Sequence, residues 1–136
     1  MNRIYSVATV MLITLVLASC ARKMNFSYST VVPDAKGRVK ITRDNNKNYI
    51  VNVNVENLPE AKNLPVPRNT YVTWLEATGA RTKNIGQINP SSSLFSKKMK
   101  GELRATATAK PYRIFITAED DGNVQYPGPQ MILSAH

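Results

Sequence analysis

Apolar and polar residues alternate with a period of two along most of the chain after residue 20. In the clearest case, Val39 and Ile41 precede a polar turn at 44–47, and Val51 and Val53 follow it. Successive side chains of a strand point to opposite faces of a sheet, so this alternation is typical of half-buried strands. Asn and Asp readily adopt turn conformations. The segment is therefore predicted to be a β-hairpin.

The same alternation, interrupted by turn residues, predicts strands along the rest of the chain. A loop with three prolines at 59–67 cannot be a central strand, and only 60–63 is expected to form a helical turn. Turn signals recur about every 8–12 residues, as in antiparallel sandwiches. The sequence thus predicts an all-β fold, an Ig-like antiparallel β-sandwich of about seven or eight strands. Besides the hairpin at 38–55, the expected strands are 26–32, 70–76, 83–88, 93–96, 102–109, 112–117 and 130–134.

Each strand is expected to bury one of its faces in the sandwich. Tyr71 and Trp74 are three residues apart, so a regular strand points them to opposite faces. We expect Trp74, together with Val72, to face the core, and Tyr71 to lie outside or at an edge. A single shared core is predicted from Val39, Ile41, Val51, Val53, Trp74, Ile114 and Ile116.

The first twenty residues differ in character from the rest. Arg3 precedes an apolar segment at 4–18, which is shorter than the roughly 20 apolar residues that span a bilayer. A positively charged N-terminal region, followed by an apolar segment and then by small residues, indicates a secretory signal peptide. Leu17-Ala18-Ser19-Cys20 resembles the lipobox of bacterial lipoproteins. The resemblance implies that the Cys20 thiol receives a diacylglycerol and that the helical signal peptide is cut before it. An uncut N-terminal membrane anchor is the alternative.

These signals divide the chain into three parts. Residues 1–19 are the predicted lipoprotein signal peptide, 20–25 the lipidated tether, and 26–136 the β-sandwich domain. The first predicted partner is thus the membrane, through lipid on Cys20, and two or three acyl chains hold far better than one. The tether is neither long nor acidic. We therefore expect a lipid-anchored protein of the bacterial cell envelope, in the outer membrane and facing the periplasm.

The formal net charge is +9, from 18 Lys and Arg against nine Asp and Glu. A basic domain beside a membrane is attracted to anionic lipid, and we expect the Lys97-Lys98-Met99-Lys100 run to contribute most. The other basic residues are scattered, which favours a solvated surface. Nucleic acid is excluded as a partner because the chain is expected to leave the cytoplasm.

The second half of the chain contains a characteristic order of residues. It consists of Tyr71-Val72-Thr73-Trp74-Leu75-Glu76, Gly79 and Ile85-Gly86-Gln87-Ile88, followed later by Phe115-Ile116-Thr117-Ala118-Glu119 and Pro127-Gly128-Pro129-Gln130-Met131-Ile132-Leu133. This order resembles the extracytoplasmic domain of the anti-sigma-K factor family, over residues 70–136. The resemblance implies a β-sandwich. The chain departs from the family at 120–123, where a proline and a Gly-Gly-Ser turn are usual. Anti-sigma activity does not carry over, because a cleavable signal leaves no cytoplasmic segment to hold a sigma factor.

No set of residues points to catalysis or metal binding. The one histidine, His136, is the last residue and the one cysteine is Cys20, whereas a zinc site needs several such ligands. The acidic run 119–121 does not have the spacing of a calcium loop. Glu76 or Glu102 could act with Asp120 as a carboxylate pair on glycosides, but no apolar cleft is indicated. We predict that the protein is not an enzyme, with no catalytic residues, no metal site and no cofactor.

Two functions remain open. The first is a non-catalytic envelope lipoprotein whose sandwich acts as an interaction or scaffold module for a protein partner. The second is a binding protein for a soluble glycan, lipid or peptide, with its site on the loops around 59–67 and 91–99. A deep apolar pocket would favour the second function, and a filled core with a flat exposed sheet face the first.

Overall fold

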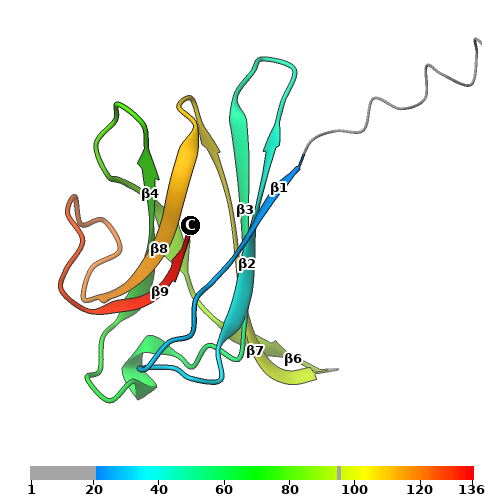
Figure 1. Cartoon of the computed structure of the whole chain (residues 1–136). Coiled ribbons are helices and arrows are strands. Elements are labelled where there is room, and N and C mark those ends of the chain that lie inside the picture. The colour runs from blue at the N-terminus through cyan, green and yellow to red at the C-terminus, as the bar shows by residue number, and fades with distance from the viewer. Residues whose placement is uncertain (1–20, 95) are drawn as a thin grey trace, which may run out of the picture.

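The computed structural model describes residues 21–94 and 96–136 (Figure 1). Cys20 and the predicted signal peptide lie outside these residues. The described chain forms two antiparallel β-sheets that face each other. The predicted all-β sandwich is therefore confirmed. Within residues 21–94 and 96–136, no helix has the length and apolar character needed to cross a bilayer.

The larger sheet has five strands in the order β1-β2-β3-β7-β6. Its centre is the predicted hairpin, in which Val39 pairs with Val53 and Ile41 pairs with Val51. These four side chains are buried against the smaller sheet, as the alternation predicts. The strands of this sheet are β1 (Arg22–Asn25), β2 (Lys36–Arg43), β3 (Tyr49–Glu56), β6 (Ser91–Ser93) and β7 (Ser96–Ala107).

The smaller sheet has four strands in the order β5-β4-β8-β9. Its central pair, β4 and β8, consists of long runs of β-branched and aromatic residues that are buried on both faces. A short 3-10 helix, η1 (Ala61–Asn63), lies in the predicted helical turn before β4. The strands of this sheet are β4 (Thr70–Ala77), β5 (Lys83–Ile88), β8 (Pro111–Glu119) and β9 (Met131–Ala135).

The start of the domain differs from the prediction. Residues 22–25, expected to be tether, form β1, and residues 27–32, expected to be part of a strand, lie in a loop that continues to residue 35. The chain leaves the larger sheet at Phe26, whose N–H donates to Gly37 O at 3.0 Å. Ser27 N–H then donates to Ser134 O of β9 at 2.8 Å. The alternation at 26–32 therefore predicted a strand wrongly, because the backbone there crosses between the sheets instead of continuing in one of them.

The boundaries of the weak strands at 93–96 and 102–109 were also wrong. Ser91–Ser93 and Ser96–Ala107 form the strands β6 and β7, and Leu94 lies in the turn between them. The long β7 is exposed on one face. It pairs with β6 at its start and with β3 over 100–107, and its many polar residues made its bounds hard to predict from the sequence.

The main core lies between the sheets, and Tyr71 belongs to it while Trp74 does not. Tyr71, Leu75 and Ala77 of β4 pack with the hairpin and with Ile114 and Ile116. The prediction of opposite faces for Tyr71 and Trp74 is confirmed, but the assignment of the faces was wrong. Both rings are fully buried.

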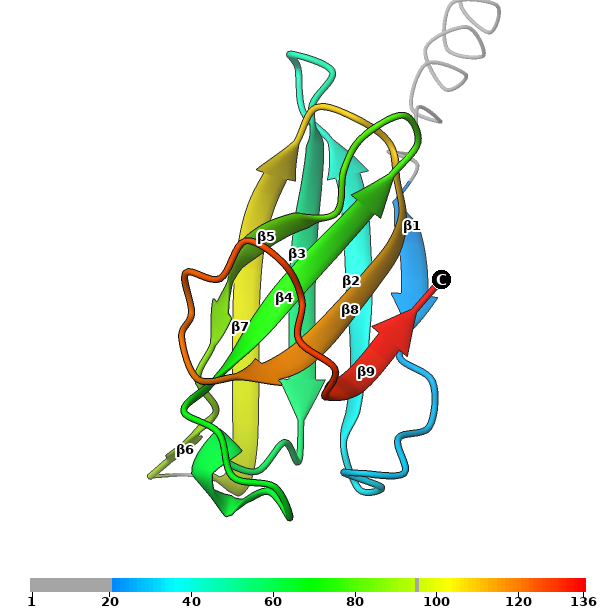
Figure 2. The ribbon, with the colours of Figure 1, turned by 90° about the vertical axis from the view of Figure 1, so that its left-hand side faces the viewer.

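Trp74 forms a second apolar cluster on the outer face of the smaller sheet. It packs there with Val72 and Phe115, and Val124 of the loop 120–130 covers this cluster. In Figure 2 the same loop runs across the face of β4 and β8. Trp74 is therefore buried by a loop, and alternation in β4 could not reveal that a loop folds over its second face.

The sandwich has two distinct ends. The end formed by the turns 44–48, 78–82 and 108–110 is called here the tether end, because Arg22 pairs with Ile41 near it. The opposite end carries the loop 28–35, the loop with η1 and the turn between β6 and β7 (Figure 2). We call it the groove end.

Candidate functional site

An open groove of about 1080 Å³ lies at the groove end of the sandwich. Three segments form it: the loop before β2, the loop that carries η1, and the start of β7. Apolar groups supply much of its wall, and three lysines and one aspartate lie among them. Its lining residues include Val31, Asp34, Lys36, Leu64, Pro65 and Met99.

The wall that carries η1 is fixed to the body of the domain from below. The Tyr71 hydroxyl donates a hydrogen bond to Pro59 O at 2.6 Å. Leu58 N–H donates to Met99 O at 3.3 Å, which joins this wall to β7. Burial raises the pKa of the Tyr71 phenol above its usual value, so the hydroxyl stays a donor over the whole physiological range. The groove is thus built on a rigid strand of the core.

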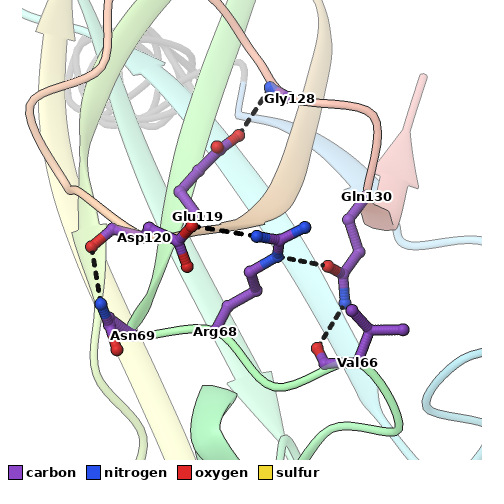
Figure 3. Close-up of polar contacts among 7 residues, drawn as sticks. All are labelled: Val66, Arg68, Asn69, Glu119, Asp120, Gly128 and Gln130. Atoms are coloured by element: carbon purple, nitrogen blue, oxygen red, sulfur yellow. Dashed lines mark hydrogen bonds and ion pairs between the residues drawn. The ribbon is translucent and has the colours of Figure 1, made fainter.

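The far side of the same loop is held by a cluster of polar contacts (Figure 3). Arg68 Nε donates to Gln130 Oε1 at 2.9 Å, and its guanidinium pairs with Asp120 Oδ2 at 3.0 Å. Gln130 Nε2 donates in turn to Val66 O at 3.0 Å, and Asn69 Nδ2 donates to Asp120 O at 3.0 Å. The cluster joins the groove wall to both ends of the loop 120–130.

A buried hydrogen-bonded chain holds the loop 120–130 against the sheet. Trp74 Nε1 donates to Thr117 Oγ1 at 2.8 Å, and that hydroxyl donates to Glu119 Oε1 at 2.7 Å. Gly128 N–H donates to the same carboxylate oxygen at 2.7 Å. Satisfied polar groups of this kind fix a unique arrangement, since each would be costly to bury alone. Glu119 is therefore a structural residue of this loop.

The charge in the groove is mainly positive. Among the described residues, neither Lys36 nor Lys97 forms an ion pair, and both are exposed. Lys98 also lines the groove, and Asp34 is the acidic residue of its lining. A groove lined by apolar groups and exposed lysines suits an extended segment that carries apolar and acidic side chains.

The sequence identified two of the three walls of this groove. The loops proposed for a ligand, around 59–67 and 91–99, do meet there. The wall at 31–36 was missed, because that segment was expected to end a strand. Its signal was present in Pro33-Asp34, which breaks the alternation and starts a turn.

Most of the acidic residues considered for metal binding or catalysis have separate structural contacts. Asp120 pairs with Arg68, Glu119 points inward to Thr117, and Asp121 Oδ1 accepts from Asn123 N–H at 2.9 Å. Glu76 pairs with Arg113 at 3.1 Å on the outer face of the smaller sheet. Across residues 21–94 and 96–136, no three His, Cys, Asp or Glu residues gather as metal ligands would. His136 is exposed at the end of the chain.

Comparison with known proteins adds no relative. No family model matches the chain, and neither the curated proteins nor the solved structures gave a match. The likeness to the lipobox and to the anti-sigma-K factor family therefore stays a prediction. The class that the structure itself defines is a small antiparallel β-sandwich with an open groove between the loops of one end.

Proposed function

We propose that this protein is a non-catalytic, lipid-anchored protein of the bacterial cell envelope, and that its sandwich is an interaction module. In this proposal the groove receives an extended segment of a partner protein, with apolar and acidic side chains. The observation that carries the proposal is an open groove, lined by apolar groups and by exposed lysines, between loops held by the core.

The placement of the groove supports this function. Arg22 lies at the tether end, two residues after Cys20, so the two Cα atoms are at most about 7 Å apart. A lipid on Cys20 would hold the tether end at the membrane surface. The groove, at the opposite end, would then point away from the membrane and into the space where a partner protein is met.

A photoreactive amino acid placed in the groove tests the proposal. We would introduce it at Met99 or at Pro65, and as a control at Asn52, which lies on the outer face of the larger sheet. The lipidated protein in its own membranes should give a discrete protein adduct from the groove positions and none from Asn52. Replacing Lys36 and Lys97 with Glu should remove the adduct. Adducts that are equal at Met99 and Asn52 would contradict the proposal.

A second function, binding of a soluble ligand, is favoured by the size of the groove. Its volume of about 1080 Å³ is close to the upper limit of about 1,000 Å³ that is common for small-molecule sites. Native mass spectrometry of the protein from its own membranes would detect such a ligand as a fixed added mass. A fixed added mass that is lost in the Lys36→Glu, Lys97→Glu variant, without a protein adduct, would favour this function.

A further inference from the structure

The basic residues of the domain are distributed unequally between its two ends. The exposed basic side chains of the tether end are Arg22, Arg43, Lys47, Arg81, Lys83 and Lys110. Among the described residues, Asp44 is the acidic residue of the three turns at that end, and its carboxylate accepts hydrogen bonds from its own turn. The tether end is therefore strongly cationic.

The groove end is close to neutral. Its lysines and Arg68 are matched by a similar number of acids, and three ion pairs form there: Lys62 with Glu60, Arg68 with Asp120, and Lys100 with Glu56. In the described chain, none of the six basic residues of the tether end takes part in an ion pair. Of the two ends, the one where the chain enters the domain therefore carries the surplus of positive charge.

Three of these cations line one small pocket. Arg22, Arg43 and Lys110 surround a space of about 270 Å³ together with Ile41, Tyr49 and Pro111. Contacts within the domain fix two of them. Arg22 Nη1 donates to Pro111 O at 3.1 Å. Arg43 Nη2 donates to Lys47 O at 2.8 Å, and its guanidinium lies 4.6 Å from the centre of the Tyr49 ring.

We propose that the tether end is a membrane-docking surface for anionic lipids, and that the pocket of Arg22, Arg43 and Lys110 receives a lipid phosphate. Guanidinium groups held in place bind phosphate oxygens with several charge-assisted hydrogen bonds, and a neighbouring ammonium adds charge. The apolar groups of the pocket suit the glycerol and upper acyl region of the same lipid. The protein would thus stand on the membrane in one orientation, with its groove outward.

This inference deepens the proposed function and relies on it for the anchor. The acyl chains would supply the attachment, and the basic end would supply the orientation. Lys97 and Lys98, the run expected to bind acidic surfaces, lie at the opposite end and line the groove instead. The turns of the tether end and the start of β7 lie at opposite ends of the sandwich (Figure 1). We therefore assign the membrane contact to the tether end and not to that run.

Binding to vesicles without the lipid anchor tests the docking surface by itself. The strands and the main core lie within residues 22–135, so the mature chain with Cys20→Ser keeps the whole domain. It should bind phosphatidylcholine vesicles that contain about a third phosphatidylglycerol, and not vesicles of phosphatidylcholine alone. The binding should be lost at about 0.5 M salt, where charges are screened within a few ångströms.

Paired variants locate the contact. Arg43→Gln with Lys110→Gln should weaken vesicle binding about tenfold or more, since each basic residue near an anionic surface contributes about fivefold. Lys47→Asn with Arg81→Gln should also weaken it, and Asn suits the positive φ of 63° at Lys47. The control Lys36→Gln with Lys97→Gln removes the same charge from the groove end and should change binding less than about threefold.

Several outcomes would overturn the docking surface. They are equal losses from the control and the tether-end variants, binding that persists at high salt, and equal binding to neutral vesicles. Incorporation of a palmitate analogue at Cys20 in the full chain is measured separately. Labelling without vesicle binding would overturn the docking surface and leave the anchor, whereas vesicle binding without labelling would overturn the anchor alone.

Discussion

At the scale of single residues, the two aromatic side chains of β4 have different tasks. Tyr71 fills the core between the sheets and holds the groove wall through Pro59, whereas Trp74 holds the loop 120–130 through Thr117. Both are fully buried, and neither is available to stack on a ligand. The proposed binding surface is consequently made by loops, and these two rings support it.

Removal of the Trp74 ring should destabilise the domain strongly. Trp74→Ala leaves a cavity beside Phe115 and removes the hydrogen bond that Thr117 Oγ1 accepts, and we expect a loss of about 3–5 kcal/mol in the free energy of unfolding. Urea denaturation measures it. Trp74→Phe, which keeps most of the apolar volume, should lose less. A loss below about 1 kcal/mol for Trp74→Ala would mean that the ring is not buried as described.

The Tyr71 hydroxyl should make the stability of the domain sensitive to alkaline pH. Because burial raises the phenol pKa above the unfolded value of about 10, its contribution is complete below that pH and is lost as the pH rises above it. Tyr71→Phe should cost about 1 kcal/mol at neutral pH through the lost hydrogen bond to Pro59. The difference in stability between the two proteins, from denaturation at each pH, should shrink above pH about 10. A constant difference would contradict this role.

At the scale of elements, side-chain hydrogen bonds hold two of the loops in place. The hairpin turn 44–48 is closed by Asp44, whose Oδ1 accepts from the backbone N–H of Asn46 and of Asn48. The hydrogen bond from the backbone N–H of Asn48 makes the largest contribution that lowers the pKa of the Asp44 carboxyl below its ordinary value. The loop 120–130 is held instead by side chains outside it: Glu119 accepts from Gly128 N–H, and Arg68 donates to Asp120.

Gly128 should be a sensitive position of the loop 120–130, because the neighbour of its Cβ position is a buried and hydrogen-bonded carboxylate. An added Cβ would lie 2.8 Å from Glu119 Oε2, so Gly128→Ala must displace the loop or the buried carboxylate. We expect a destabilisation of about 1–3 kcal/mol and faster proteolysis within 120–130. Gly79 is the matched control: it has a φ of +72° and no atom near its Cβ position, so Gly79→Asn should be tolerated. Equal stability of Gly128→Ala and the parent protein would contradict the close approach.

At the scale of the whole molecule, the two ends of the sandwich have different chemistry. The tether end is cationic and adjoins the proposed anchor, and the groove end is close to neutral overall, with an open apolar groove. A domain that is attached at one end and binds at the other can serve as an interaction module at a membrane surface. The distribution of charge over the fold, rather than the net charge, supports this organisation.

In the proposed function, Cys20 is the residue that attaches the molecule to a membrane. Cys20→Ser should leave the precursor uncut after Ser19 and should abolish labelling by a palmitate analogue, because the thiol is the acceptor of the lipid. Gel mobility and labelling in the bacterial host measure the two effects. Ala21→Ser, which leaves the thiol in place, is the control and should be labelled normally. Labelling of the Cys20→Ser protein would contradict the lipoprotein prediction.

The sequence by itself determined the hairpin, the faces of its strands and three further strands. Alternation over 38–55 and the strand runs at 70–76, 83–88 and 112–117 reappear in the sheets, since a strand has only two faces and a polar turn fixes the register. Which face of β4 meets the other sheet was decided by tertiary structure alone. Both faces are apolar, and the loop 120–130 covers the one that bears Trp74.

The groove and the cationic tether end were also decided by tertiary structure. Residues of the groove are as far apart in the sequence as Val31 and Met99, and those of the tether-end pocket as far apart as Arg22 and Lys110. No local pattern joins them, because their proximity follows from the order of strands in the two sheets. Local alternation reports which side chains share a face, whereas the folded topology determines which loops share an end.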